Sequence, residues 1–144
     1  MSTFQTSRKI SASIESVFAA IRTPERLARW WGPAGFTNTF EVCEFKPGGL
    51  WKYTMHGPDG RDYPNETVFA EIESPNKVVI QHSSLPKYTL VITLASEKNE
   101  TLVSWAQTFD KPEVAKAIAH IVVPANEQNL DRLTAEVFRL TSDG

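Results

Sequence analysis

The stretch from Ile10 to Pro33 constrains the fold of this chain most, because it ends on two adjacent tryptophans. It reads ISASIESVFAAIRTPERLARWWGP. Trp30 and Trp31 present a large apolar surface that is costly to leave in water, so other elements must cover them. Gly32 and Pro33 stop any helix that reaches the tryptophans. The segment therefore predicts a helical end wall packed over an apolar interior.

Two short helices are predicted inside this stretch. Ser11 or Ser13 can cap the first, because a serine hydroxyl accepts a bond from a free amide of the first turn. The apolar residues of this helix recur at helical spacing: Ile14, Val17, Phe18 and Ile21. Thr23 and Pro24 form an N-cap and first-turn pair, which starts a second helix that ends on the tryptophans.

Between residues 37 and 109, short turn motifs separate strand-like runs, which is typical of antiparallel strands joined by short loops. Together with a first strand at the N-terminus, the predicted strands are Thr3–Ile10, Thr37–Phe45, Leu50–His56, Asp62–Glu73, Lys77–Ser83, Tyr88–Ser96 and Glu100–Phe109. In the third of these, Trp51, Tyr53 and Met55 share one face, because side chains alternate along a strand. A sheet with one apolar face needs a cover, for which the remaining candidate is the C-terminal helix.

The C-terminal helix carries one stripe of residues that step by three or four positions: Ile118, Ile121, Ala125, Asn129, Leu133, Val137 and Leu140. Pro124 removes a backbone donor and clashes with the preceding turn, so we expect two helical segments, 112–122 and 124–140. The resulting order is one strand, two helices, six strands and a helix. We predict an α+β fold, with a curved antiparallel sheet of about seven strands wrapped around the final helix.

Composition limits the class of protein and of partner. The 144 residues have the size of one domain, 1–144, and carry 15 basic against 17 acidic residues, which gives a net charge of −2. No overall field recruits nucleic acid, and no apolar run approaches the roughly 20 residues that cross a bilayer. Cys43 is the only cysteine, and the first ten residues lack a secretion-signal layout. We expect a cytoplasmic protein without membrane insertion, as a monomer or weak homodimer.

Several motifs, in order along nearly the whole chain, resemble one known family. They are the Ile10–Pro33 run with its Trp30-Trp31-Gly32-Pro33 end, the segment Phe45–Gly49 followed by Trp51, the turn Gly57–Gly60, and Asn129–Leu133. Together these are similar to the activator-of-Hsp90-ATPase-homologue-like (AHSA1-like) branch of the START/Bet v 1-like SRPBCC superfamily. The resemblance implies a helix-grip fold, with a cavity between sheet and final helix that typically holds lipids, polyketides or other apolar molecules. We expect no cofactor.

A cavity in such a fold would be lined by apolar residues of the sheet and the final helix, with few polar groups. The candidate ligand-binding residues are Trp31, Trp51, Tyr53, Met55, Phe69, Ile80, Tyr88, Trp105, Ile121, Asn129 and Leu133. The alternative is a solid core made of the same side chains. Asn126 and Asn129 could bind a ligand hydroxyl or carbonyl, or instead bond to neighbouring protein groups. The tryptophan pair could gate the cavity, or one tryptophan could be core while the other covers the junction of helix and sheet.

The sequence predicts no metal site and no catalytic residue. The three histidines, His56, His82 and His120, lie far apart and lack metal-ligand spacing. We expect non-catalytic binding of a small hydrophobic molecule, such as a lipid, polyketide or flavonoid. One alternative is a cyclase- or aromatase-like enzyme, with His82 or a tyrosine moving a proton. Another is a chaperone-interacting module that stimulates Hsp90. Arg61 and Glu66 could form a polar cluster at a pocket rim or be solvated edge charges.

Overall fold

Seven antiparallel strands form one sheet in the computed structural model, which describes residues 2–143, with side chains up to residue 139. The strands are β1 (Thr3–Ile10), β2 (Thr37–Cys43), β3 (Gly49–His56), β4 (Asp62–Glu73), β5 (Lys77–His82), β6 (Tyr88–Glu97) and β7 (Glu100–Phe109). Their order in the sheet is β1-β7-β6-β5-β4-β3-β2, so β2 to β7 form a meander and β1 pairs with β7 at the far edge. The predicted strands are confirmed, and their ends shift by no more than two residues.

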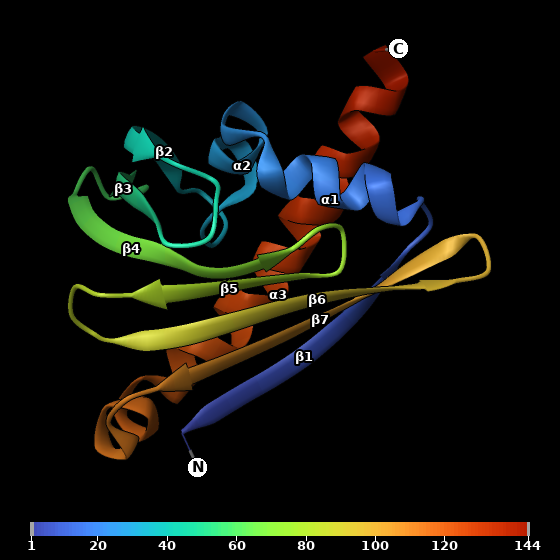
Figure 1. Ribbon diagram of the computed structural model, residues 1–144. Helices are drawn as coiled ribbons and strands as arrows, with labels where there is room; N and C mark the ends of the chain where they lie inside the picture. Colours follow the sequence, from blue (N-terminus) through green and yellow to red (C-terminus); the bar gives the residue numbers. More distant parts are fainter. Residues whose placement is uncertain (1, 144) are drawn as a thin grey trace.

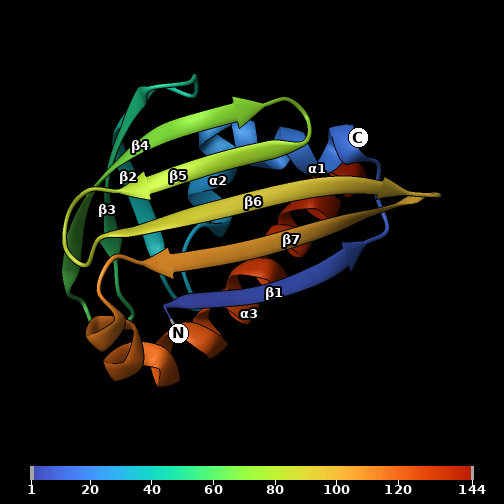
Figure 2. The same ribbon diagram turned by 60° about the horizontal axis from the view of Figure 1, so that its bottom comes forward.

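Three helices complete the fold: α1 (Ile14–Arg22), α2 (Pro24–Trp30) and α3 (Pro112–Asp143). The hydroxyl of Ser13 caps α1 by accepting a bond of 3.1 Å from the amide of Ser16. α1 and α2 close one end of the sheet, while α3 runs across its concave side against β1 and β7 (Figure 1). The sheet curves so strongly that β2 and β3 stand steeply to β6 and β7 (Figure 2). This is the helix-grip fold that the sequence predicted.

The prediction of two segments around Pro124 is wrong, because α3 continues through this residue as one helix. Pro124 and the residue His120, whose carbonyl loses its helical partner, are both exposed, so water can solvate that carbonyl. The ribbon bends after its first turns in both views, which is the usual response to an internal proline. The predicted stripe is also displaced at this point: Ile121 is 58% exposed, whereas Val122 is buried. The side chain of Leu140 lies outside the described residues.

The tryptophan pair belongs to the core. Trp30 and Trp31 are 1% and 4% exposed, and both rings contact the ring of Trp105 on β7, with centroids 6.2 and 6.1 Å apart. The indole of Trp30 donates a hydrogen bond of 2.9 Å to the carbonyl of Ala20, which joins α2 to α1. The pair therefore fixes the helical end wall onto the sheet, as the sequence predicted.

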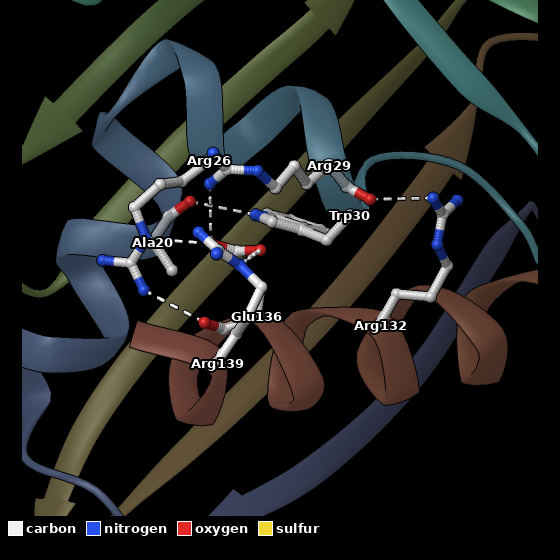
Figure 3. Close-up of polar contacts among 7 residues, drawn as sticks. All are labelled: Ala20, Arg26, Arg29, Trp30, Arg132, Glu136 and Arg139. Carbon is white, nitrogen blue, oxygen red and sulfur yellow. Dashed lines mark hydrogen bonds and ion pairs between the residues drawn. The ribbon is translucent and has the colours of Figure 1, made fainter. Parts of the chain in front are cut away.

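A buried carboxylate fastens this end wall to α3. Glu136 is 4% exposed and accepts bonds from Arg26 at 3.1 Å, from Arg29 at 3.3 Å and from Arg139 at 3.0 Å (Figure 3). We call these four residues the Glu136 cluster. Burial alone would raise the pKa of Glu136, but the bonds from Arg139 and Arg26 and the charges of Arg139 and Arg29 lower it below its usual value.

One turn earlier on α3, Arg132 holds the loop between α2 and β2. Its guanidinium donates to five backbone carbonyls, that of Arg29 in the last turn of α2 and four in this loop, with the bonds to Arg29 (Figure 3), Gly32 and Phe36 at 2.8 to 2.9 Å. A planar guanidinium with five donors suits such a ring of acceptors. The loop that begins at Trp31 is thereby placed over the interior of the sheet.

Candidate functional site

A cavity of about 210 Å³ lies between the concave side of the sheet and the middle of α3. The sheet, the loop after α2, the β5–β6 loop and one face of α3 supply its walls. The lining residues are Trp31, Gly32, Pro33, Tyr53, Met55, Asn65, His82, Pro86, Tyr88, Leu90, Trp105, Gln107, Ile121, Val122, Ala125, Asn126 and Asn129. Most of this surface is aromatic or aliphatic, with a few polar groups, as is typical of sites for small molecules.

Seven of the eleven candidate residues lie in this lining: Trp31, Tyr53, Met55, Tyr88, Trp105, Ile121 and Asn129. The other four, Trp51, Phe69, Ile80 and Leu133, are at most 2% exposed and lie in the solid part of the core. Trp51 stacks on Phe69 with centroids 5.2 Å apart and an interplanar angle of 7°. Phe45 packs edge-on against Phe69 on the same side. Aromatic rings therefore fill the end of the sheet under α1 and α2, and the hollow lies beyond them.

His82, at the end of β5, is held on both ring nitrogens. Nδ1 lies 2.8 Å from the carbonyl oxygen of Pro86, and Nε2 lies 2.5 Å from Oδ1 of Asn65. The amide of Asn65 is oriented in turn by its bond to the carbonyl of Tyr63. The imidazole also stacks on the phenol ring of Tyr88, with centroids 4.5 Å apart. Burial lowers the pKa of His82, and backbone hydrogen bonds oppose that change.

The two tyrosines of the wall are neutral at physiological pH. Burial raises the pKa of Tyr53 well above its usual value, and the phenol of Tyr88 adds to the effect. Burial likewise raises the pKa of Tyr88 beyond its normal range. Among the described lining residues there is no Asp, Glu, Lys or Arg. The cavity lining is therefore mainly apolar, with a few polar side chains and no acidic or strongly basic one.

Asn129 supports the wall through bonds to the protein. Its Oδ1 accepts a bond of 3.0 Å from the amide of Gly32, and its Nδ2 donates to the carbonyl of Ala125 at 3.2 Å. Gly32 has a φ of +103°, which side chains other than hydrogen rarely permit. Asn129 thus holds the tight turn that brings Trp31 to the cavity, which agrees with the alternative of a bond to neighbouring protein groups.

Two polar atoms at the cavity have no partner within the described part of the chain. They are Nε1 of Trp105 and Oε1 of Gln107, both buried. The sequence reasoning missed Gln107, although it sits two residues after Trp105 on the same face of β7. It also missed Asn65, which is paired with Tyr53 in the β3–β4 register and so shares its face. Alternation along the strand was the signal in both cases.

The remaining candidates lie away from the cavity. His56 is bonded to Asp62 and Thr39, each at 2.7 Å, on partly exposed surface, and His120 is exposed. Arg61 and Glu66 are exposed edge charges. No group of three or more metal-ligating side chains occurs in the described part of the protein. No helix within residues 2–143 is long and apolar enough to cross a membrane.

Solved structures with the same fold come from several bacteria. A protein from Arthrobacter aurescens has a TM-score of 0.88 at 25% identity, covering 96% of this chain and 87% of its own. A protein from Nitrosomonas europaea has a TM-score of 0.88 at 18% identity, with 97% and 96% covered. An AHSA1-like protein from Aeromonas hydrophila has a TM-score of 0.72 at 20% identity, with 96% and 94% covered.

The family assignment comes from the sequence itself. No curated protein matches the chain. The profile of the family described as "Activator of Hsp90 ATPase homolog 1-like protein" matches residues 11–137. This range contains the tryptophan pair, the strands β2 to β7 and the cavity-lining part of α3. The chain therefore belongs to the Activator of Hsp90 ATPase homolog 1-like family.

Proposed function

We propose that this protein binds a small apolar molecule, without catalysing a reaction, in the cavity between the sheet and α3. The observation that carries the proposal is a hollow of about 210 Å³ whose described lining is apolar or neutral and holds no charged side chain. The hollow lies beside the close-packed core and opens toward the surface, where its lining residues Pro86 and Ile121 are exposed. Of the lipid-, polyketide- and flavonoid-like classes, the volume favours the smaller molecules, because typical ligand pockets measure about 300–1,000 Å³.

The engagement of His82 favours binding over proton transfer. A general base needs a free nitrogen within reach of its substrate. Both nitrogens of His82 face oxygen atoms of the protein, on Pro86 and Asn65. The raised pKa values of Tyr53 and Tyr88 keep the phenols from acting as bases near neutral pH. A cyclase- or aromatase-like activity would first require these contacts to break.

The outer face of the sheet gives little support to a chaperone-binding role. On β3 this face carries Lys52 and Thr54, and Lys52 lies 3.8 Å from Glu66 of β4. A docking surface for a large partner is usually aromatic or aliphatic at its centre.

A cavity-filling variant tests the proposal. Ala125 lines the cavity on α3, whereas Ala117 lies on an exposed face of the same helix. A library of hydrophobic compounds is screened against the wild type by thermal unfolding and by amide NMR spectra. A ligand at about 100 times its Kd stabilises the folded state by about 2.7 kcal/mol. We expect Ala117→Phe to keep this stabilisation and Ala125→Phe to lose it. A library without any hit, or equal responses of the two variants, would contradict the proposal.

A further inference from the structure

Two neighbouring positions on β7 carry two of the four buried side-chain polar atoms that lack partners in the described residues. The other two, Oδ1 of Asn38 and Nε1 of Trp51, belong to residues outside the cavity lining. Trp105 and Gln107 are consecutive inward-facing residues, 3% and 8% exposed, with Cα atoms about 7 Å apart along the strand. The indole Nε1 can only donate a hydrogen bond, and the amide Oε1 can only accept one. Neither finds a partner among the described residues. An unpaired donor and an unpaired acceptor therefore belong to neighbouring inward-facing residues of one cavity wall.

Trp105 is flanked in the register by Ile92 on β6 and by Thr6 on β1, and the hydroxyl of Thr6 donates to Glu127. Gln107 is flanked in the register by Leu90 on β6 and by Phe4 on β1, which have no polar side-chain atoms. Two other polar groups of the cavity are already engaged: His82 with Pro86 and Asn65, and Asn129 with Gly32. The buried amide of Asn126 is a further polar group of the lining. Buried polar groups are nearly always paired in native proteins, so an unpaired donor and acceptor at a cavity are groups that a water molecule or a ligand can pair.

The cavity is unfavourable for a charged ligand. An ion taken from water into an apolar site must find an opposite charge or lose its own. The described lining offers no carboxylate, ammonium or guanidinium; burial lowers the pKa of its imidazole and raises the pKa values of its phenols. A carboxylate or amine ligand would therefore be left without a counter-charge. A neutral group that both donates and accepts meets every requirement of the wall.

The volume limits the rest of the ligand. An apolar cavity of about 150 Å³ is known to hold benzene. At about 210 Å³ the present cavity has room for one ring with one or two small substituents. Fused-ring flavonoids and long acyl chains exceed this space.

We propose that the cavity selects a neutral, single-ring molecule that carries a hydroxyl or a primary carboxamide. Oε1 of Gln107 accepts a hydrogen bond from this group, and Nε1 of Trp105 donates one to it. The inference rests on the proposed function and narrows its ligand class.

A series of probes with one ring in common tests the inference. Toluene, benzyl alcohol, benzamide and benzoate are titrated at pH 8 against the protein, and Kd values are taken from amide NMR shifts. We expect benzyl alcohol and benzamide to bind about tenfold more tightly than toluene, because each pairs buried groups that toluene leaves unpaired. We expect benzoate to bind at least tenfold more weakly than benzamide.

Substitutions assign the selectivity to the two residues. Gln107→Leu should bring the affinity for benzamide down to that for toluene. Trp105→Phe removes the other polar group, and Gln107→Met replaces Gln107→Leu should the latter not fold. Gln81→Leu is the matched control, because Gln81 lies on the exposed face of β5. It should keep the wild-type preference.

The outcomes separate this inference from the proposed function. Equal binding of toluene and benzamide, tight binding of benzoate, or an unchanged preference in Gln107→Leu would overturn the inference and leave apolar binding standing. A hit from the hydrophobic library, combined with no binding of any single-ring probe, would do the same. Failure of both the library and the probes would overturn the proposed function as well.

Discussion

Two regions along α3 differ in whether the buried polar groups next to the helix have hydrogen-bond partners. Toward the C-terminus, Glu136 is surrounded by three arginines, and Arg132 donates to five carbonyls, one in the last turn of α2 and four in the loop after it. In the middle of the helix, the wall that faces Ala125 and Asn126 leaves Trp105 and Gln107 each with an unpaired polar atom. The buried polar groups at the C-terminal end of α3 are therefore paired, whereas two on β7, opposite the middle of α3, are not.

This difference separates structure from function within a single element. A fully paired buried network fixes one arrangement, because removing any member exposes the others to an uncompensated cost. An unpaired couple at a cavity costs stability in the empty protein and becomes useful only when a ligand pairs it. The Glu136 cluster thus supports the end wall, and the unpaired polar atoms of Trp105 and Gln107 on β7 are available to bind a ligand.

The largest effect is expected from breaking the closed region. Glu136→Ala removes the acceptor of Arg26, Arg29 and Arg139 and leaves the buried Arg26 without its carboxylate. We expect a loss of about 3–5 kcal/mol in the free energy of unfolding, the cost typical of a broken buried ion pair. Urea denaturation followed by tryptophan fluorescence measures it.

A surface carboxylate on the same helix provides the control. Glu127 is half exposed and pairs with Arg8 at 3.1 Å. Glu127→Ala should cost less than about 1 kcal/mol, as exposed ion pairs do. Similar losses in the two variants would mean that the Glu136 cluster is no stronger than a surface pair.

The second effect concerns the loop that both regions share. Arg132→Lys replaces a planar five-donor group by an ammonium that cannot reach the same ring of carbonyls. We expect a loss of about 2 kcal/mol, in the range of hydrogen bonds to charged groups. Amide hydrogen exchange should speed up from Trp31 to Phe36, because this loop loses its anchor. Arg61→Lys, at an exposed position, should change neither quantity.

The sequence predicted more of the fold than of the site. The β-strand alternation and the Ser13 cap are local signals, so the strands and α1 were placed from the chain alone. The cavity depends on how far the strongly curved sheet stands from α3, which no local pattern encodes. Trp51 and Tyr53 are equivalent in pattern, yet Trp51 is packed under the end wall and Tyr53 faces the hollow. The predicted helix break at Pro124 was wrong for a related reason. Whether a proline breaks a helix depends on the exposure of the preceding turn to water, which the sequence pattern does not show.

The third effect is a pH dependence at the cavity. Burial lowers the pKa of His82 in the folded protein, against an ordinary value near 6.5 in the unfolded chain. The unfolded chain therefore binds more protons in acid, and stability should fall as the pH drops below about 6.5. Thermal unfolding midpoints between pH 8 and pH 5.5 measure this loss. His82→Gln should flatten the curve in that window, whereas the exposed His120→Gln should not. An unchanged slope in His82→Gln would show that other groups carry the dependence.

The smallest effect should have the opposite sign. In the ligand-free protein, Gln107→Leu replaces a buried, unpaired amide oxygen by an apolar group of similar size next to Leu90. Removing such an orphan is neutral or stabilising, so we expect the free energy of unfolding to rise by up to about 1 kcal/mol, where Glu136→Ala lowers it. Urea denaturation of both variants in one buffer compares the signs directly. A loss of more than about 1 kcal/mol in Gln107→Leu would mean that the amide already has a partner, such as an enclosed water molecule. The polar groups opposite the middle of α3 would then be paired like those of the Glu136 cluster, and the contrast between the two regions would disappear.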